Sequence, residues 1–124
     1  MKKQSELYEL LNEKNTLNEI QNYIKEVIKI RGFSEQKVQD EMLLLLEETG
    51  ELAKAIRKTI PEASVDYERI ENYTDIEEEV ADVFIVLVSI CNRLNINLYD
   101  AIIKKEEKNI KRQWKLNAGE NNEQ

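Results

Sequence analysis

The sequence contains no histidine, one cysteine, one proline and three glycines among its 124 residues. Without histidine, the chain lacks the commonest general base and the commonest protein ligand for transition metals. The single cysteine, Cys91, has no partner for an internal disulfide. Glycine and proline are too scarce for the many turns of a β-sandwich. Any chemistry must therefore rely on carboxylates, lysine, arginine, amides or tyrosine.

Positive charge and long apolar runs are also missing. The formal net charge is -7 and the isoelectric point is about 4.8, so the long-range field repels a phosphate backbone and disfavours nucleic-acid binding. No stretch approaches the ~20 apolar residues that span a bilayer, and the N-terminal MKKQSELYELL lacks the apolar segment of a signal peptide. We therefore expect a cytoplasmic protein with no membrane partner.

Residues that favour helices are abundant in this sequence. The length of the chain is that of a single domain. Thr16 followed by Glu19, and Thr74 followed by Glu77, are capping-box patterns that open helices. We predict a weakly helical N-terminal extension over residues 1–15, one domain over 16–114 and a disordered tail over 115–124. Within the domain, helices are expected at about 16–31, 35–59, 74–94 and 98–114. Short connections, and one loop over 62–73, predict an all-α, antiparallel four-helix bundle-like module.

Two of these helices carry paired acids beside apolar positions. Glu48 and Glu51 lie three residues apart in LLLLEETGELAKAI, and Glu79 and Asp82 do so in EEEVADVFIVLV. A single pair of this kind is usually a solvated face. Four carboxylates gathered at the edge of a core would repel one another unless a cation neutralised them. Gly50, which costs about 1 kcal/mol in a helix interior, suggests that backbone or ligand approaches this site closely.

The ligand types favour Mg²⁺, with Mn²⁺ as a substitute, because hard cations prefer oxygen donors. Magnesium usually keeps waters or substrate phosphates in its remaining positions, and this indicates phosphate chemistry. A ferritin-like di-iron site is excluded, because it needs histidine ligands.

The helix expected over 74–94 is apolar on much of its circumference. Its apolar positions are Val80, Val83, Phe84, Val86, Leu87, Ile90, Cys91 and Leu94. A small domain offers too little partner surface for such a helix, so we predict a homo-oligomer, most simply a symmetric dimer.

Three sequence elements together resemble the MazG-like all-α nucleoside triphosphate pyrophosphohydrolases. EETGE at 47–51 and EVAD at 79–82 are similar to the family's EExxE…ExxD signature, and KKEEKNIKR is similar to its KxxxNxxR element, which assigns Lys105, Asn109 and Arg112. The latter three also share a helix face, where they could meet phosphate oxygens, although a lysine-rich helix end would look the same.

The resemblance implies an oligomeric enzyme, a homodimer or a dimer of dimers, that binds Mg²⁺ through Glu48, Glu51, Glu79 and Asp82. It implies hydrolysis of a (d)NTP between the α and β phosphates by a metal-activated water, giving a nucleoside monophosphate and pyrophosphate. By the same resemblance Glu47 orients or deprotonates that water. The family does not fix the base of the substrate.

Two matters stay open at this stage. Phe33, just before the metal-bearing helix, is our candidate for stacking on the base, and packing is the alternative role for it as for the other aromatics. The alternative to an enzyme is a non-catalytic helical interaction module whose acids bind a structural divalent cation.

Overall fold

The computed structural model describes residues 2–60 and 75–113, and every regular element in these two ranges is an α-helix. The helices are α1 (Gln4–Glu9), α2 (Leu17–Ile30), α3 (Val38–Arg57), α4 (Ile76–Arg93) and α5 (Leu98–Asn109). The predicted all-α class is confirmed. Several predictions lie outside the described residues: the loop at 62–73, the helix cap at Thr74, the helix end at Trp114 and the tail at 115–124.

Local signals explain where two helices begin. The capping box of α2 forms as predicted: the Glu19 backbone N–H donates to Thr16 Oγ1 at 3.1 Å, and the Thr16 N–H donates to Glu19 Oε1 at 2.8 Å. At α5 the Asn97 side chain accepts from the Asp100 N–H at 2.9 Å. Asn95 just before it has φ of 56°, a left-handed conformation that asparagine tolerates better than most residues and that turns the chain between α4 and α5.

Helix α3 begins later than its sequence suggests. We expected it from about residue 35 with Ser34 as its cap, but the first helical residue is Val38 and the N-cap is Lys37, whose side chain makes no capping bond. The Ser34 carbonyl instead accepts a hydrogen bond from Arg93 of α4. A tertiary contact therefore holds the α2–α3 connection in a non-helical path.

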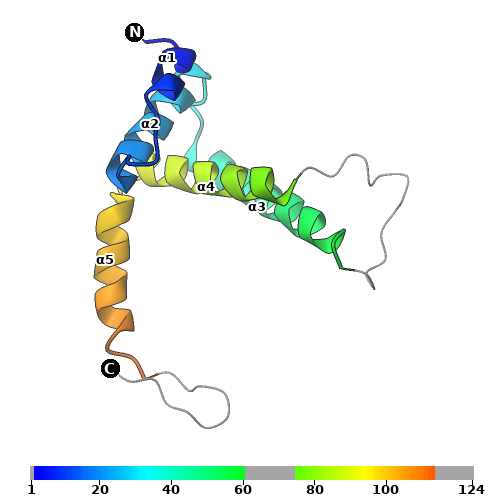
Figure 1. Cartoon of the computed structure of the whole chain (residues 1–124), viewed down its shortest axis with the longest axis vertical. Helices are drawn as coiled ribbons and strands as arrows, with labels where there is room; N and C mark the ends of the chain where they lie inside the picture. Colours follow the sequence, from blue (N-terminus) through cyan, green and yellow to red (C-terminus); the bar gives the residue numbers. More distant parts are fainter. Residues whose placement is uncertain (1, 61–74, 114–124) are drawn as a thin grey trace.

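The centre of the fold is the antiparallel pair of α3 and α4. Their direction follows from their contacts, since Glu41 near the start of α3 meets Ser89 near the end of α4. Helix α2 packs against α4, and α1 packs against α2 (Figure 1). The buried apolar side chains are few and come from these three long helices: Ile24, Val27, Ala55, Val88, Ile90 and Cys91.

Helix α5 leaves this core. It packs chiefly against α2 and projects away from the α3–α4 pair (Figure 1). A buried side chain holds its start in place: Gln21 Nε2 donates to Asn92 Oδ1 at 2.9 Å and to the Ile96 carbonyl at 2.8 Å, and its Oε1 accepts from the Leu98 N–H at 2.9 Å. The described part of one chain therefore does not enclose a four-helix bundle, and the bundle stays a prediction for an assembly.

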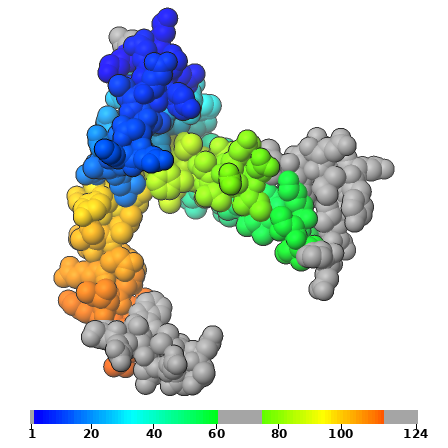
Figure 2. All heavy atoms as spheres, viewed as in Figure 1, coloured from blue at the N-terminus to red at the C-terminus, as the bar shows by residue number. Residues whose placement is uncertain are grey.

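Large apolar side chains remain on the surface of α4, α3 and α5. Along α4, Val80 is 52% exposed, and Phe84 and Leu87 are also exposed. Helix α3 adds Met42, Leu43 and Leu46, and α5 adds Tyr99, Ile102 and Ile103. The space-filling view shows how open the arrangement of α2, α4 and α5 is (Figure 2). An open molecule with this much apolar surface is typical of a chain that associates.

Candidate metal centre

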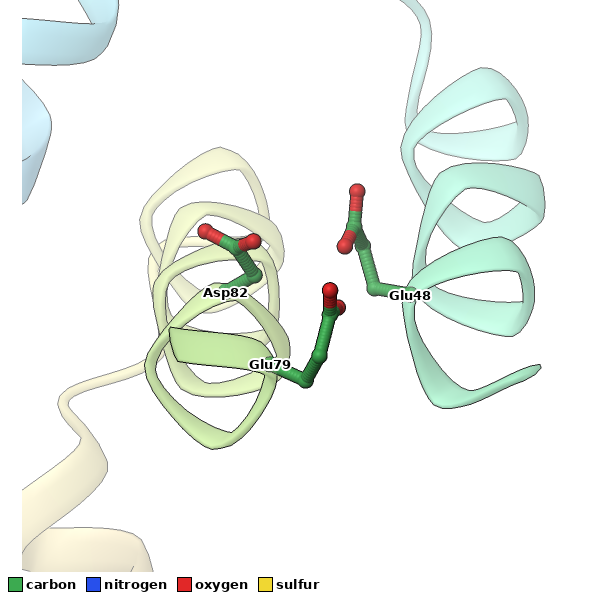
Figure 3. Close-up of side chains that lie close together, drawn as sticks. All are labelled: Glu48, Glu79 and Asp82. Carbon is green, nitrogen blue, oxygen red and sulfur yellow. The ribbon is translucent and has the colours of Figure 1, made fainter. Parts of the chain in front are cut away.

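Three carboxylates from α3 and α4 meet at the surface where these helices face each other. Glu48 comes from α3, and Glu79 and Asp82 come from α4, where a spacing of three residues puts both on one face. One oxygen from each lies within 4.8 Å of the others. In the close-up, Glu48 points across the gap toward the two acids of α4 (Figure 3). We call Glu48, Glu79 and Asp82 the carboxylate triad.

The surroundings of the triad disfavour negative charge. Burial raises the pKa of Glu48, and the neighbouring Asp82 and Glu79 raise it further. Burial also raises the pKa of Glu79, with Asp82 and Glu51 adding to the effect and Lys54 opposing it. Glu79 is only 4% exposed, and its Oε2 has no hydrogen-bond partner among the described residues. Oxygen donors that are crowded, partly buried and short of partners fit a hard divalent cation.

Glu51, the fourth predicted ligand, does not point into the triad. Its side chain is half-exposed, and its Oε2 lies 3.7 Å from Lys54 Nζ, one turn further along α3. Its charge still raises the pKa of Glu79 and of Glu48, so it lies near the triad without joining it. The structure therefore brings together three of the four predicted ligands.

The neighbouring candidate Glu47 is exposed, and its charge contributes to the raised pKa of Glu48. Gly50 was predicted to allow a close approach by backbone or ligand. A Cβ atom built at this position meets nothing within 4 Å, so neither backbone nor side chain of the described residues approaches it. Within residues 2–60 and 75–113, no backbone approaches this glycine closely, and the approach of a ligand stays a prediction.

The predicted phosphate-binding residues are not near the triad of their own chain. Lys105 and Asn109 lie on α5, and Arg112 follows its last turn. Because α5 packs chiefly against α2 and projects away from α3 and α4, the described chain does not join these residues to the triad (Figure 1).

Phe33 lines a separate cavity of about 100 Å³ between the α2–α3 connection and the α3–α4 pair. Three residues close to it, Glu41, Ser89 and Arg93, were not predicted from the sequence. Ser89 Oγ donates to Glu41 Oε1 at 2.7 Å, and Arg93 Nε lies 3.9 Å from Glu41 Oε2. The Arg93 guanidinium also donates to the carbonyls of Ser34 and Gln36.

A spacing in the sequence could have identified two of these residues. Glu41 lies seven residues before Glu48, and Ser89 lies seven residues after Asp82. Seven residues are two helical turns, so each shares a helix face with a member of the triad.

The family model of the MazG nucleotide pyrophosphohydrolase domain matches residues 36–116. The chain belongs to this family. The match covers α3 to α5 and includes the carboxylate triad, Glu47 and Glu51, together with the three predicted phosphate-binding residues. Phe33 lies just outside it, and the match begins later than the domain start that we predicted at residue 16.

Membership in the MazG family supports nucleotide pyrophosphohydrolase activity in general, and divalent-metal dependence is general in the family. No curated protein matches the chain. Among the helices of residues 2–60 and 75–113, none combines the length and the apolar character that crossing a membrane requires.

Proposed function

We propose that this MazG domain hydrolyses a nucleoside triphosphate between its α and β phosphates and releases a nucleoside monophosphate and pyrophosphate. The observation that supports the proposal is the carboxylate triad on the antiparallel α3–α4 pair, with a buried oxygen of Glu79 that lacks a partner. A site of three carboxylates without histidine suits Mg²⁺, or Mn²⁺ in its place.

In this proposal, four acids bind the ion and a fifth acts on the attacking water. Glu48, Glu79 and Asp82 hold the ion, and Glu51 adds a fourth carboxylate when its side chain leaves Lys54. An ion held there would neutralise charge on the phosphate oxygens and lower the pKa of a water molecule. Glu47 is exposed beside Glu48, where it orients the attacking water and takes its proton.

The remaining negative charge of the triphosphate requires cations. We assign Lys105 and Arg112 to this role and the Asn109 amide to a hydrogen bond with a phosphate oxygen, as the family element implies. Because α5 projects away from the triad of its own chain, these residues reach a triad most directly in a second copy of the chain. The proposed enzyme is therefore a homodimer, or a dimer of dimers, in which α5 of one chain completes the site of another.

The exposed apolar surface supports the same assembly. Val80, Phe84 and Leu87 lie on one stripe of α4, close in sequence to the triad acids of that helix, and all three are exposed. Burial of this stripe against a second chain would remove apolar surface from water and stabilise the dimer.

The activity is tested by incubating the protein with eight ribo- and deoxyribonucleoside triphosphates and Mg²⁺. We expect equal amounts of monophosphate and pyrophosphate from at least one of them. Glu48→Gln and Asp82→Asn should each abolish turnover and keep the helical circular dichroism signal. The matched control is Glu77→Gln, which neutralises an exposed acid of the first turn of α4 and should leave turnover unchanged.

Two results would reject the proposal. Release of single orthophosphates would indicate a different phosphohydrolase. Absence of turnover with both Mg²⁺ and Mn²⁺ would favour the non-catalytic helical module with a structural cation.

A further inference from the structure

A cavity of about 240 Å³ lies between α2 and α4 and carries positive charge on its wall. Lys25 and Lys29 of α2 and Arg93 of α4 line it, together with Ser34 of the α2–α3 connection. Among the described residues no acid lines this cavity, although acids outnumber basic residues by 25 to 18 in the sequence. Cations gathered around a hollow raise the local positive potential and attract anions.

Helix α2 carries its opposite charges on different sides. Glu19 and Glu26 line the cavity that α2 forms with α1, whereas Lys25 and Lys29 line the cavity that it forms with α4. The acids of this helix are therefore directed away from its two lysines. A positive patch remains on the α4 side of a chain whose net charge is -7.

The two lysines also lack local partners of opposite charge in the part of the chain that the structure describes. Neither Lys25 nor Lys29 pairs with an acid within residues 2–60 and 75–113. Like charges four residues apart on a helix repel each other and destabilise it slightly. An anion bound between the two ammonium groups would remove this repulsion. The positions three and four residues from Lys25 hold Gln21, Asn22, Ile28 and Lys29, none of which is acidic.

Arg93 is already engaged and forms a fixed part of the wall. Its guanidinium donates to the carbonyls of Ser34 and Gln36, and its Nε lies 3.9 Å from Glu41 Oε2. These contacts use the planar fork that would otherwise bind a carboxylate at two points, and Glu41 offsets the charge. The donors that remain for a ligand are the ammonium groups of the two lysines and the Ser34 hydroxyl.

The size of the cavity and the type of its donors favour a phosphate group. At about 240 Å³ the cavity exceeds the roughly 150 Å³ that encloses one benzene molecule, so a tetrahedral phosphate fits within it. Lysine binds phosphate as a point charge and needs no planar partner. A phosphate offers a separate oxygen to each of three donors, whereas a carboxylate has only two oxygens.

This cavity is separate from the carboxylate triad and from α5. Arg93 follows Asp82 by eleven residues of α4, which is about 15 Å along the helix axis. The cations that we assign to the triphosphate, Lys105 and Arg112, do not line the cavity. A phosphate bound here would therefore occupy a second position on the chain.

We propose that Lys25, Lys29 and Ser34 form a binding site for a phosphate group, either inorganic phosphate or the phosphate of a small ester. The two ammonium groups donate charged hydrogen bonds to the phosphate oxygens, and the Ser34 hydroxyl donates a third. The ligand joins α2 to the α2–α3 connection beside Arg93. This inference goes beyond the proposed hydrolysis and does not depend on it.

The first test measures binding without turnover. The protein is freed of divalent ions with EDTA, dialysed and titrated calorimetrically with inorganic phosphate, so that a metal at the triad cannot contribute. We expect saturable binding of one phosphate per chain, and weaker binding of malonate, a dicarboxylate. Absence of saturable binding, or tighter binding of malonate, would overturn the inference. Glycerol 3-phosphate distinguishes the two sources, because tighter binding of the ester indicates a metabolite and equal binding indicates free phosphate.

The second test removes the donors. Lys25→Gln and Lys29→Gln combined should lower phosphate affinity roughly tenfold or more, because two charged hydrogen bonds are lost. Ser34→Ala keeps the backbone carbonyl that Arg93 binds and should lower affinity roughly threefold. An unchanged affinity in either variant would contradict the proposed site.

Two control variants separate this site from other causes of phosphate binding. Lys2→Gln and Lys14→Gln combined remove the same total charge from exposed positions outside the cavity and should leave the affinity unchanged. An equal loss in this control would indicate a general electrostatic effect and overturn the inference. Arg112→Ala should also bind phosphate normally, and loss of binding in it would place the phosphate at α5 instead. A protein that binds phosphate as expected but cleaves no triphosphate would keep this site while the proposed hydrolysis failed.

Discussion

Glu79 carries a charge that its surroundings disfavour. It is buried against α3, one of its oxygens lacks a hydrogen-bond partner among the described residues, and burial together with Asp82 raises its pKa. Such a group lowers the free energy of unfolding of the metal-free protein, and it can bind a cation. Functional sites often lower stability in this way.

Replacing this carboxylate by its neutral isostere should therefore stabilise the metal-free protein. In Glu79→Gln the repulsion with Asp82 disappears, and the amide NH₂ can donate to the neighbouring acids. We expect the melting temperature in EDTA to rise by a few degrees, and the further rise on adding Mg²⁺ to be lost. Differential scanning calorimetry measures both. Glu77→Gln is the control, and an equal response to Mg²⁺ in both variants would contradict the assignment of Glu79.

The raised pKa values also predict a pH dependence. A carboxyl group whose pKa is higher in the folded than in the unfolded chain stabilises the fold below the unfolded pKa, and this stability is lost as the pH rises through the folded pKa. For Glu48 and Glu79 the loss begins near their ordinary value of 4.5 and continues up to their raised values.

The measurement is the melting temperature in EDTA as a function of pH. As the pH rises from 4.5 to the raised pKa values, ionisation of Glu48 and Glu79 should lower the melting temperature. In Glu79→Gln the melting temperature should fall less steeply over the same pH range. Mg²⁺ should oppose the decline, because it binds the deprotonated acids. Identical pH profiles of the unmodified protein and Glu79→Gln in EDTA would refute the prediction.

Among the helices, α3 shows what periodicity can and cannot predict. A spacing of three residues placed Glu79 and Asp82 on one face of α4, and their position beside apolar residues predicted that they meet Glu48 of α3. A capping box located the start of α2, and α5 begins at the predicted Leu98. The start of α3 was wrong because Arg93, 59 residues away in sequence, holds the carbonyl of Ser34. Contacts between residues far apart in sequence cannot be predicted from the spacing of residues within one helix.

The buried network around Glu41 escaped prediction for a similar reason. One acid near the start of a helix is common, and it favours that position through the helix dipole. Only the packing of α4 shows that Glu41 is enclosed and paired with Ser89. The projection of α5 was equally hidden, because it depends on Gln21 of α2 binding both Ile96 and Leu98.

Gly50 permits a test of the interior of α3. In the part of the chain that the structure describes, no atom outside the neighbouring turns of α3 lies within 4 Å of a Cβ built at this position, so Gly50→Ala fills no occupied space. Alanine loses less conformational entropy on folding, and the variant should be more stable by about 0.5–1 kcal/mol in urea unfolding. A loss of stability together with dissociation of the oligomer would instead show that a second chain approaches this glycine.

In the proposed assembly, the complete site combines residues of two chains. The triad lies on α3 and α4, whereas Lys105, Asn109 and Arg112 belong to a segment that packs against α2. In a symmetric dimer each site would then combine α3 and α4 of one chain with α5 of the other.

Subunit complementation tests this arrangement. Glu48→Gln and Arg112→Ala should each be inactive as pure proteins. When the two are co-refolded in equal amounts, mixed dimers contain one site with both groups intact, and about a quarter of the unmodified activity should return. Glu48→Gln mixed with Glu79→Gln is the control and should stay inactive, because both changes lie on the same triad. An inactive first mixture would place the whole site within one chain.

The hydrogen bonds of Gln21 have a consequence for how such an enzyme would respond to its own abundance. They fix the direction in which α5 leaves the core, so a solitary chain holds the side chains assigned to phosphate binding away from its acids. Hydrolysis would then switch on only above the concentration at which chains pair. A freshly synthesised or highly diluted copy of the proposed enzyme would leave its substrate untouched.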